Sequence, residues 1–236
     1  DAIRAELPGA NCGACGYAGC DDYAKAVAHS GAKTNLCIPG GAGTAAAVSA
    51  AMGVVAEEVK PQYAVVHCSG NCNATEDSMD YQGKQTCAAS KMFYNGKGSC
   101  QFGCLGFGDC MNVCQYGAIA IVNGIAVVDK SVCVGCGMCS KVCPNHLISV
   151  IPATNTIYVG CSSKDKGAVT RKVCKNGCIG CKKCEKACEQ GAITVTDNVA
   201  SIDPEKCINC GKCVTGCPTG AIVTCESRCE SIPVSA

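Results

Sequence analysis

The chain has 236 residues, of which 27 are cysteine and only 4% are aromatic. This composition disfavours one large apolar core and favours small units that cysteine chemistry holds together. The net charge of +1 excludes the strongly basic balance of a nucleic-acid-binding chain. Neither a signal peptide nor an apolar run of about 18 residues is present. Because the chain opens with Asp1 and not Met, we expect further sequence upstream.

The first predicted unit is helical and covers residues 1–60. Glycines separate its cysteines, which lets the backbone wrap closely around a bound group. A short helix is predicted over residues 21–29, with two aspartates in its first turn, and a second over residues 44–60, which Pro61 should end. Alone, this motif also suits zinc, but the motifs that follow favour an iron–sulfur cluster. Its predicted ligands are Cys12, Cys15, Cys20 and Cys37.

Three further runs have the spacing C-x2-C-x2-C-x3-C. In bacterial ferredoxins, three cysteines of such a run bind one iron–sulfur cluster and the fourth binds a second cluster. Four cysteines within eleven residues are too many for one tetrahedral zinc ion, and an odd total of 27 rules out complete pairing in disulfides. Iron–sulfur is therefore favoured over a zinc or disulfide scaffold. The predicted ligands are Cys133, Cys136, Cys139 and Cys143, then Cys178, Cys181, Cys184 and Cys188, then Cys207, Cys210, Cys213 and Cys217.

An internal repeat of 74 residues relates two parts of the chain, because nine cysteines recur at that interval without a gap. Such regularity predicts two copies of one structural unit. We expect an α+β fold, in which a small N-terminal helical 4Fe-4S domain precedes two tandem two-cluster bacterial-ferredoxin-like β-α-β modules. Module one should occupy residues 61–153, and module two residues 154–236. With so few apolar residues, the clusters should form part of the core, so the fold should fail without metal.

Each module is predicted to contain a β-hairpin and short helices. Apolar runs at residues 118–122 and 125–128 flank an Asn-Gly pair, which is typical of a two-residue hairpin turn. Residues 192–196 and 199–202 repeat the pattern around Asp-Asn. A short helix that carries the remote cysteine is expected after each cluster loop.

One position breaks the repeat, because Phe107 stands where module two has Cys181. By the ferredoxin rule, two cysteines of this run and Cys143 should share a cluster with one corner open. Three outcomes are compatible with the sequence: Cys100 fills the corner, the cluster is a three-iron form, or the cluster is absent. The remaining predicted ligands of the run are Cys104, Cys110 and Cys114.

Eight cysteines lie outside these runs. The motif-defined sites alone predict at least five 4Fe-4S clusters, and two further sets of four cysteines would make seven. The alternative is that several of the eight are buried free thiols, since cysteine is among the most buried residue types. The tentative sets are Cys68, Cys72, Cys87 and Cys100, and Cys161, Cys174, Cys225 and Cys229.

No catalytic residues are predicted, because the sequence has neither a dinucleotide-binding fingerprint nor a phosphate-binding loop. The three histidines are scattered without the spacing of a Rieske site, and we expect them to be surface or packed residues. The chemistry indicated is one-electron transfer in a reducing compartment, because the ligands must be free thiolates. The histidines are His29, His67 and His146.

The N-terminal motif resembles the RnfB family. The resemblance rests on the stretch LPGANCGACGYAGC that begins at Leu7, with Cys37 and Pro-Gly-Gly downstream. The stretch CSSKDKG at Cys161 and the tandem ferredoxin motifs are similar to the long form of the family, so the resemblance covers nearly the whole chain. It implies a subunit of a membrane-bound ferredoxin:NAD+ oxidoreductase that translocates sodium or protons. This chain would relay electrons, and the NAD site would lie on a partner.

The resemblance also implies partners and a location. External ferredoxin would donate electrons, other Rnf-type membrane and flavin or NAD subunits would accept them, and the chain would lie at the cytoplasmic face of the cell membrane. Members of the family usually carry an N-terminal transmembrane helix, which would lie upstream of Asp1. The alternative function is a soluble polyferredoxin or the iron–sulfur subunit of a cytoplasmic oxidoreductase.

Charge is uneven in module two, where eight basic side chains between residues 161 and 188 accompany only Asp165 and Glu185. We hypothesise that this basic stretch steers an acidic ferredoxin to the clusters of module two. The alternative is an ordinary solvated face on a loop. The basic residues are Lys164, Lys166, Arg171, Lys172, Lys175, Lys182, Lys183 and Lys186.

Overall fold

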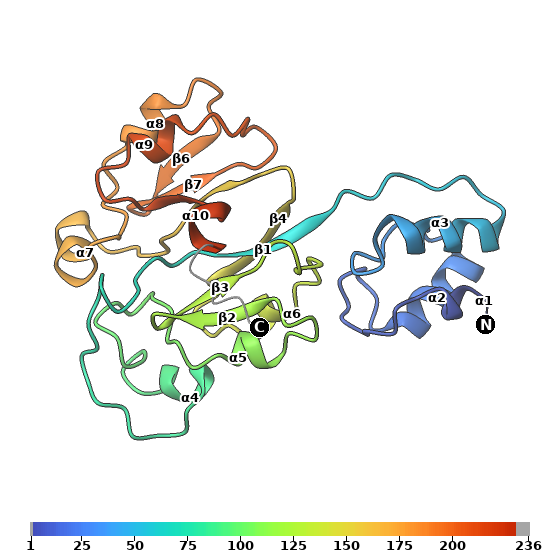
Figure 1. The fold of residues 1–236 in the computed structure, drawn as a ribbon, viewed down its shortest axis with the longest axis horizontal. Helices are drawn as coiled ribbons and strands as arrows, with labels where there is room; N and C mark the ends of the chain where they lie inside the picture. Colours follow the sequence, from blue (N-terminus) through green and yellow to red (C-terminus); the bar gives the residue numbers. More distant parts are fainter. Residues whose placement is uncertain (1, 230–236) are drawn as a thin grey trace.

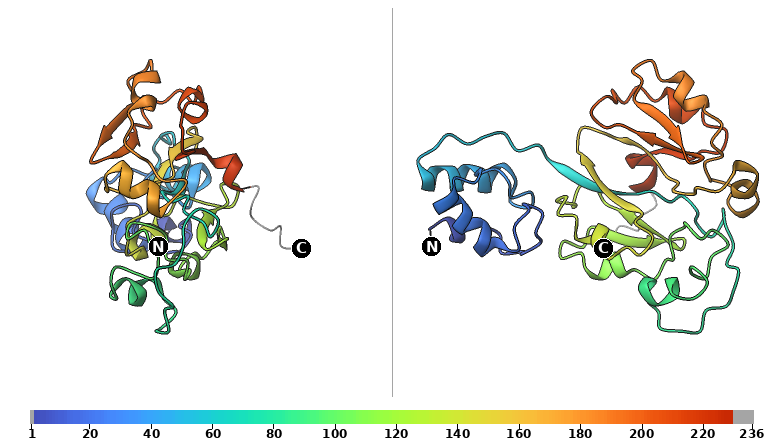
Figure 2. Two further views of the ribbon diagram at one scale, coloured as in Figure 1. Left: turned by 90° about the vertical axis from the view of Figure 1, so that its left-hand side faces the viewer. Right: turned by 180° about the vertical axis from the view of Figure 1, so that it is seen from behind.

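The computed structural model describes residues 2–229, except for the side chain of Cys229. Figure 1 shows a helical unit at the N-terminus, an extended connection, and two mixed α/β units that lie against each other. Seen from behind in Figure 2, the helical unit again stands to one side of the other two. Every helix within residues 2–229 is too short or too polar to span a membrane.

The N-terminal unit consists of α1 (Ala2–Ala5), α2 (Cys20–Ser30) and α3 (Gly41–Met52). Tyr23, Val27 and Val48 are almost fully buried at its centre, where they pack with two of the predicted ligand cysteines. The Tyr23 hydroxyl donates to the Lys33 carbonyl at 2.7 Å, so its polar atom is satisfied. Helix α2 confirms the helix predicted over residues 21–29.

The prediction of a helix over residues 44–60 is wrong at its C-terminal end. Helix α3 stops at Met52 because Gly53 adopts a left-handed conformation with φ of 68°. The Gly53 and Val54 N–H groups bond back to carbonyls of the last turn, which is a common way for a helix to end at glycine. The chain then runs outside any helix to residue 61, so the glycine, and not Pro61, ends the helix.

Module one contains two separate antiparallel two-stranded sheets. One joins the two ends of the module, with Ala64 opposite Val150, and the other is the predicted hairpin. In chain order the elements are β1 (Gln62–Val66), α4 (Cys87–Lys91), α5 (Asp109–Asn112), β2 (Ile119–Val122), β3 (Ile125–Val128), α6 (Met138–Val142) and β4 (Ile148–Pro152).

Module two repeats this plan. Strand pair β5·β8 joins its ends, β6·β7 is the second predicted hairpin, and α10 packs against β3 of module one as well as β8. The elements are β5 (Ile157–Val159), α7 (Gly167–Val173), α8 (Lys183–Ala187), β6 (Ile193–Thr196), β7 (Val199–Ile202), α9 (Lys212–Thr215), β8 (Ile222–Thr224) and α10 (Cys225–Cys229).

Cysteines form part of the core of each module. In module one, Cys110 and Cys139 are buried among aliphatic residues of β1, β2, β3 and β4. In module two, Cys178 and Cys213 are buried in the same way. The third cysteine of each ferredoxin run lies within a short helix, and the fourth lies at or just beyond the end of that helix. The short helices therefore separate the sulfur atoms that each run contributes to different sites.

Candidate iron–sulfur centres

The four cysteines of the N-terminal unit come together, as their spacing predicted, and we call them the N-terminal set (Cys12, Cys15, Cys20 and Cys37). Burial raises the pKa of the Cys37 thiol, and the other three cysteines raise it further. The loop around them turns through glycines with positive φ, 68° at Gly13 and 86° at Gly16. The Cys20 N–H donates to the Asn11 side-chain oxygen at 2.8 Å, which fixes the start of α2 beside the loop.

The next set lies in module one and follows the ferredoxin rule. Burial raises the pKa of Cys139 to about 12, with further contributions from Cys133, Cys136 and Cys114. Cys114 comes from the other run, just beyond α5. The Ala64 N–H of β1 donates to the Cys133 sulfur at 3.4 Å. We call Cys114, Cys133, Cys136 and Cys139 the proximal set.

Module two shows the same exchange of cysteines between runs. Burial raises the pKa of Cys213 to about 11, and Cys207 and Cys210 add to the shift. The neighbours of Cys184 are instead Cys178 and Cys217, the latter from the last run. Although burial opposes ionisation, hydrogen bonds from Thr219, Ala221 and Ile222 lower the pKa of the Cys217 thiol, which favours a thiolate there.

The site left incomplete by Phe107 receives a fourth cysteine that the sequence prediction placed elsewhere. Cys87 and Cys143 both lie near Cys104, and all three lie near Cys110. The same four residues line one small cavity. Cys100, which was one predicted replacement, lies elsewhere. We call Cys87, Cys104, Cys110 and Cys143 the Cys87 set.

Asp109 holds Cys87 in this position. Its carboxylate accepts hydrogen bonds from the N–H groups of Cys87 and Ala88 at 3.0 and 3.1 Å. The Thr86 hydroxyl accepts from the Ala89 N–H and caps the same end of α4. The first turn of α4 is thereby tied to the first turn of α5, which carries Cys110.

Phe107 packs against side chains of the segment that precedes it. Its ring lies 5.6 Å from the Tyr81 ring, and the Lys97 ammonium lies 5.5 Å from its centre. Tyr81 also contacts Phe93 at 6.1 Å. These aromatic contacts hold together the long segment between β1 and α5 that delivers Cys87.

The eight tentative cysteines do not divide as the sequence grouping proposed. Cys87 belongs to the set just described. Cys225 is buried among Tyr63, Val65 and Tyr158, in an apolar cluster. The side chain of Cys229 lies outside the described residues. Cys72 is exposed at the rim of a cavity of about 280 Å³ between the modules, and four less exposed cysteines line the same cavity: Cys68, Cys100, Cys161 and Cys174.

The histidines lie where packed or surface residues are expected. His29 and His146 are exposed. The two ring nitrogens of His67 are 2.7 Å from the Val159 carbonyl and 2.7 Å from the Ser149 hydroxyl, so both have hydrogen-bond partners. Burial lowers the pKa of His67, which favours the neutral ring. His67 therefore links the modules through β5 and β4.

The N-terminal unit meets module one beside the proximal set. The Lys141 ammonium of α6 donates to the Cys12 carbonyl at 2.8 Å. Burial raises the pKa of Tyr116, and Cys136, Cys12 and Cys37 add to the shift, so this tyrosine lies near both sets. The two groups of sulfurs are therefore adjacent, although more than a hundred residues separate Cys12 from Lys141 along the chain.

The donor chemistry fits iron–sulfur clusters. Within the described residues no group of three or more Cys, His, Asp or Glu side chains converges on a single ion position. A four-iron cube instead takes each thiolate on a different iron, so its ligands surround the bound group. Backbone N–H groups that donate to sulfur, as at Cys133 and Cys143, supply the hydrogen bonds that such ligands use.

Comparison with known families supports this chemistry. Residues 7–39 match a family model described as "Putative Fe-S cluster". Residues 126–149 match a 4Fe-4S binding domain, and residues 177–221 match a 4Fe-4S dicluster domain. The fold and its cysteine sets thus define a protein with several 4Fe-4S clusters.

Individual relatives are more specific. The B subunit of the Na(+)-translocating ferredoxin:NAD(+) oxidoreductase complex of Acetobacterium woodii is 41% identical over 86% of the chain, which spans 62% of that protein, somewhat less than two thirds. The proton-translocating counterpart of Clostridium ljungdahlii is 39% identical over 86% of the chain and 72% of its own length. The equivalent protein of the ion-translocating oxidoreductase complex of Methanosarcina acetivorans is 42% identical over 87% of the chain and 78% of its own length.

The chain therefore belongs to the RnfB-type family, the B subunits of the ion-translocating ferredoxin:NAD+ oxidoreductase complexes, as the N-terminal motif predicted. Members of this family are iron–sulfur electron-transfer subunits.

Proposed function

We propose that the chain carries electrons from reduced ferredoxin along a row of 4Fe-4S clusters to the other subunits of a membrane-bound, ion-translocating ferredoxin:NAD+ oxidoreductase. Clusters of this kind supply one-electron transfer when bound. The observation that carries the proposal is the adjacency of the N-terminal set, the proximal set and the Cys87 set, which a second module of the same plan follows.

Five of these sets follow from the motifs and from Cys87. In module two the ferredoxin rule assigns Cys181 to the Cys178 group and Cys188 to the Cys213 group. We call these the Cys181 set (Cys178, Cys181, Cys184 and Cys217) and the distal set (Cys188, Cys207, Cys210 and Cys213). Together with the N-terminal, proximal and Cys87 sets, they make each module a two-cluster ferredoxin-like unit.

The row has a direction that suits the proposed role. The N-terminal set lies against module one, beside the proximal set. The Cys181 and distal sets lie in module two, on the far side of the molecule from the N-terminal unit (Figure 1). Electrons that enter at module two would leave at the N-terminal unit, at the cytoplasmic face of the membrane where the integral subunits lie.

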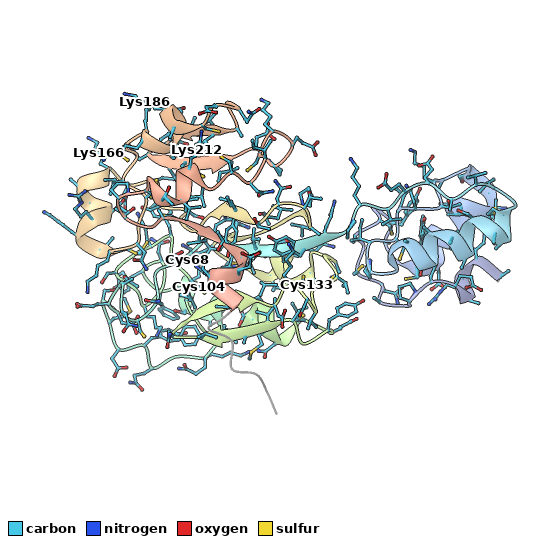
Figure 3. The ribbon with its side chains drawn as sticks, turned by 45° about the horizontal axis from the view of Figure 1, so that its top comes forward. Cys68, Cys104, Cys133, Lys166, Lys186 and Lys212 are labelled. Atoms are coloured by element: carbon cyan, nitrogen blue, oxygen red, sulfur yellow. The ribbon has the colours of Figure 1, made fainter. Side chains whose placement is uncertain are left out.

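Basic side chains support entry at module two. All eight basic residues between 161 and 188 are exposed. Figure 3 shows Lys166, Lys186 and Lys212 on the end of module two that points away from the N-terminal unit. Only Lys164 and Lys182 of the stretch lie near acidic partners within the described residues, Asp197 at 3.9 Å and Glu185 at 3.8 Å. The remaining positive charge is available to an acidic ferredoxin.

Charge reversal tests this entry point. Lys183→Glu with Lys186→Glu changes two exposed residues of α8 that make no salt bridge among the described residues. We expect the rate of electron transfer from reduced ferredoxin, measured by stopped flow at low salt, to fall about tenfold, with a weaker dependence on ionic strength. Lys25→Glu with Lys60→Glu is the matched control on exposed N-terminal residues and should leave the rate unchanged. Equal rates for both variants would refute docking at α8.

Cluster content tests the relay itself. Chain purified without oxygen should contain at least about 20 iron and about 20 sulfide per molecule, from five four-iron clusters. Cys207→Ser with Cys210→Ser, in the distal set, should remove about four of each. A chain that contains no iron and is nevertheless folded would refute the proposed relay.

A further inference from the structure

The cavity between the modules is lined by cysteines that no ferredoxin run contains. Cys68 and Cys100 come from module one, and Cys161 and Cys174 come from module two. All four lie outside the stretches that match known iron–sulfur domains. The cavity volume of about 280 Å³ is far larger than the share of one water molecule in the liquid, roughly 30 Å³. A polyatomic group fits this space better than a single ion.

Cys100 is a neighbour of each of the other three cysteines. Cys100 lies close enough to Cys68, Cys161 and Cys174 for charge on one to affect the others. Cys68 and Cys174 meet at Gly70, where an added Cβ would lie 3.6 Å and 3.4 Å from their sulfur atoms. Both sulfurs therefore lie beside Gly70, which also lines the cavity. We call these four residues the interface set.

The interface set has an approximate two-fold symmetry that relates the modules. Cys174 follows Cys100 by the repeat interval of 74 residues. Cys68 and Cys161 correspond through the strands, because each follows the first strand of its module. The residue before each donates its N–H to the chain entering the last strand, His67 to Leu147 and Gly160 to Ala221, both at 2.7 Å. Each module thus contributes one cysteine of each kind.

Cys68 and Cys161 receive equivalent hydrogen bonds. The Cys104 N–H donates to the Cys68 sulfur at 3.3 Å, and the Cys178 N–H, 74 residues later, faces the Cys161 sulfur. A second N–H comes from the residue two positions after each cysteine. Cys104 and Cys178, which donate to these two sulfurs, are themselves members of the neighbouring Cys87 and Cys181 sets.

Cys100 and Cys174 show the same equivalence. N–H groups of Phe102 and Gly103 face the Cys100 sulfur, and those of Asn176 and Gly177 face the Cys174 sulfur. Each of the four sulfurs therefore has two backbone donors. Such donors stabilise a thiolate, against the burial that raises the pKa of Cys68 to about 12. Backbone N–H donors of this kind are the hydrogen bonds that cluster-bound cysteine sulfurs use.

The frame around the cavity is held by contacts between the modules. The Asn176 amide donates to the Ser69 carbonyl at 2.9 Å, and the Thr75 hydroxyl donates to the Val173 carbonyl at 2.7 Å. Arg228 of α10 donates to the Cys68 carbonyl at 2.7 Å and to the Ser69 hydroxyl at 2.8 Å. These contacts hold both cysteine loops in place around the cavity.

We infer that Cys68, Cys100, Cys161 and Cys174 bind a further 4Fe-4S cluster that the two modules share. A cluster delivered on carrier thiolates would be bound by exchange: at each iron the bond to the carrier sulfur breaks, an S–Fe bond to one cysteine forms, and the proton of that cysteine passes to the departing thiolate. The inference rests on the proposed function for the role of this cluster, which joins the Cys87 set to the Cys181 set. Figure 3 shows Cys68 and Cys104 close together in the middle of the molecule, away from Cys133, which lies toward the N-terminal unit.

Anaerobic iron and sulfide analysis tests the inference. The full chain should contain about 24 iron, from six four-iron clusters. Cys100→Ser with Cys174→Ser should lower iron and sulfide by about four each, and so should the symmetry-related pair Cys68→Ser with Cys161→Ser. Cys225→Ser is the matched control, because Cys225 lies in an apolar cluster and does not line the cavity, and it should change neither count.

The outcomes separate the two proposals. An unchanged count in either interface pair overturns the shared cluster, while the losses at the distal set still support the relay. One zinc and no iron lost from the interface pairs would also overturn it. Native mass spectrometry of the unmodified chain does not depend on how the variants fold. Six cubes are expected, and five would contradict the inference.

Discussion

The two modules contain the same series of repeated cysteines, but the fourth cysteine of one cluster site comes from a different part of each module. In the proposed assignment module two uses Cys181, which lies within its run, whereas module one has Phe107 at that place and brings Cys87 from a separate helix. The longer segment between Cys68 and Cys100 in module one contains that helix, and Asp109 positions it. The comparison teaches that a cluster site is defined by where sulfurs meet in space, so a ligand can move along the sequence without changing the site.

The largest expected effect concerns both modules equally. Removing iron under anaerobic conditions with a chelator should unfold them, because the buried cores of both consist partly of ligand cysteines. Far-UV circular dichroism should lose most of its strand and helix signal. A chain that keeps its spectrum without iron would show that the aliphatic residues of the sheets suffice for the fold.

The next largest effect tests the fourth ligand of one cluster in each module. Cys87→Ser should lower the iron content by between about one and about four atoms, because three thiolates can hold at most a three-iron form. Cys181→Ser should have the same effect in module two. The electron paramagnetic resonance signal of an oxidised three-iron cluster would show which outcome occurs. If Cys87→Ser keeps its full iron content while Cys181→Ser loses it, Cys87 is not a ligand.

A rescue experiment sharpens the comparison. Adding Phe107→Cys to Cys87→Ser gives module one the ligand arrangement of module two. We expect the iron content to return to the value of the unmodified chain, since residue 107 occupies the place of Cys181 in the repeat. Phe107→Leu in the same background is the control and should not restore iron.

A smaller effect is expected at Asp109. Asp109→Ala removes the acceptor of two backbone N–H groups and should destabilise module one by about 1–3 kcal/mol. Lys183 occupies the equivalent position in module two and makes no comparable contact within the described residues, so Lys183→Ala should change stability by less than about 0.5 kcal/mol. Chemical denaturation under anaerobic conditions measures both. Equal losses would mean that Asp109 does not hold Cys87.

The smallest effect concerns the contact with the N-terminal unit. Lys141 of module one donates to the Cys12 carbonyl, whereas module two has Thr215 at the equivalent position. Lys141→Ala should weaken docking of the N-terminal unit by about 1 kcal/mol or less, because the contact is exposed. Hydrogen exchange in residues 12–16 should become faster. Thr215→Ala should leave that exchange unchanged.

Regular spacing made much of this molecule predictable. The hairpins at β2·β3 and β6·β7 follow from short apolar runs around turn residues, and the structure has them as predicted. A short helix does occur in each cysteine run, but the remote fourth cysteine lies beyond the end of the helix and is not carried by it as predicted. Strand pairs β1·β4 and β5·β8 were missed, because β1 is buried on both faces and shows no alternation of polar and apolar residues.

The 74-residue interval also misled in one place. It pairs Cys87 with Cys161, yet Cys161 follows the first strand of module two as Cys68 does in module one. Cys87 has no structural counterpart among the described residues of module two and completes the Phe107 site instead. A signal for its separate role was present in Thr86, which is a good residue to begin a helix, and in the long segment around it.

The sequence by itself determined the iron–sulfur chemistry, the family and the repeated modules. Three cysteines at short intervals lie on one loop, so their sulfurs bind the same cluster wherever the rest of the chain goes. Only the tertiary structure decided which distant cysteines join them. Cys87 reaches its set through the contact of α4 with Asp109, and the interface set exists only where two modules meet. Such meetings depend on packing between segments far apart in the chain, which local spacing does not encode.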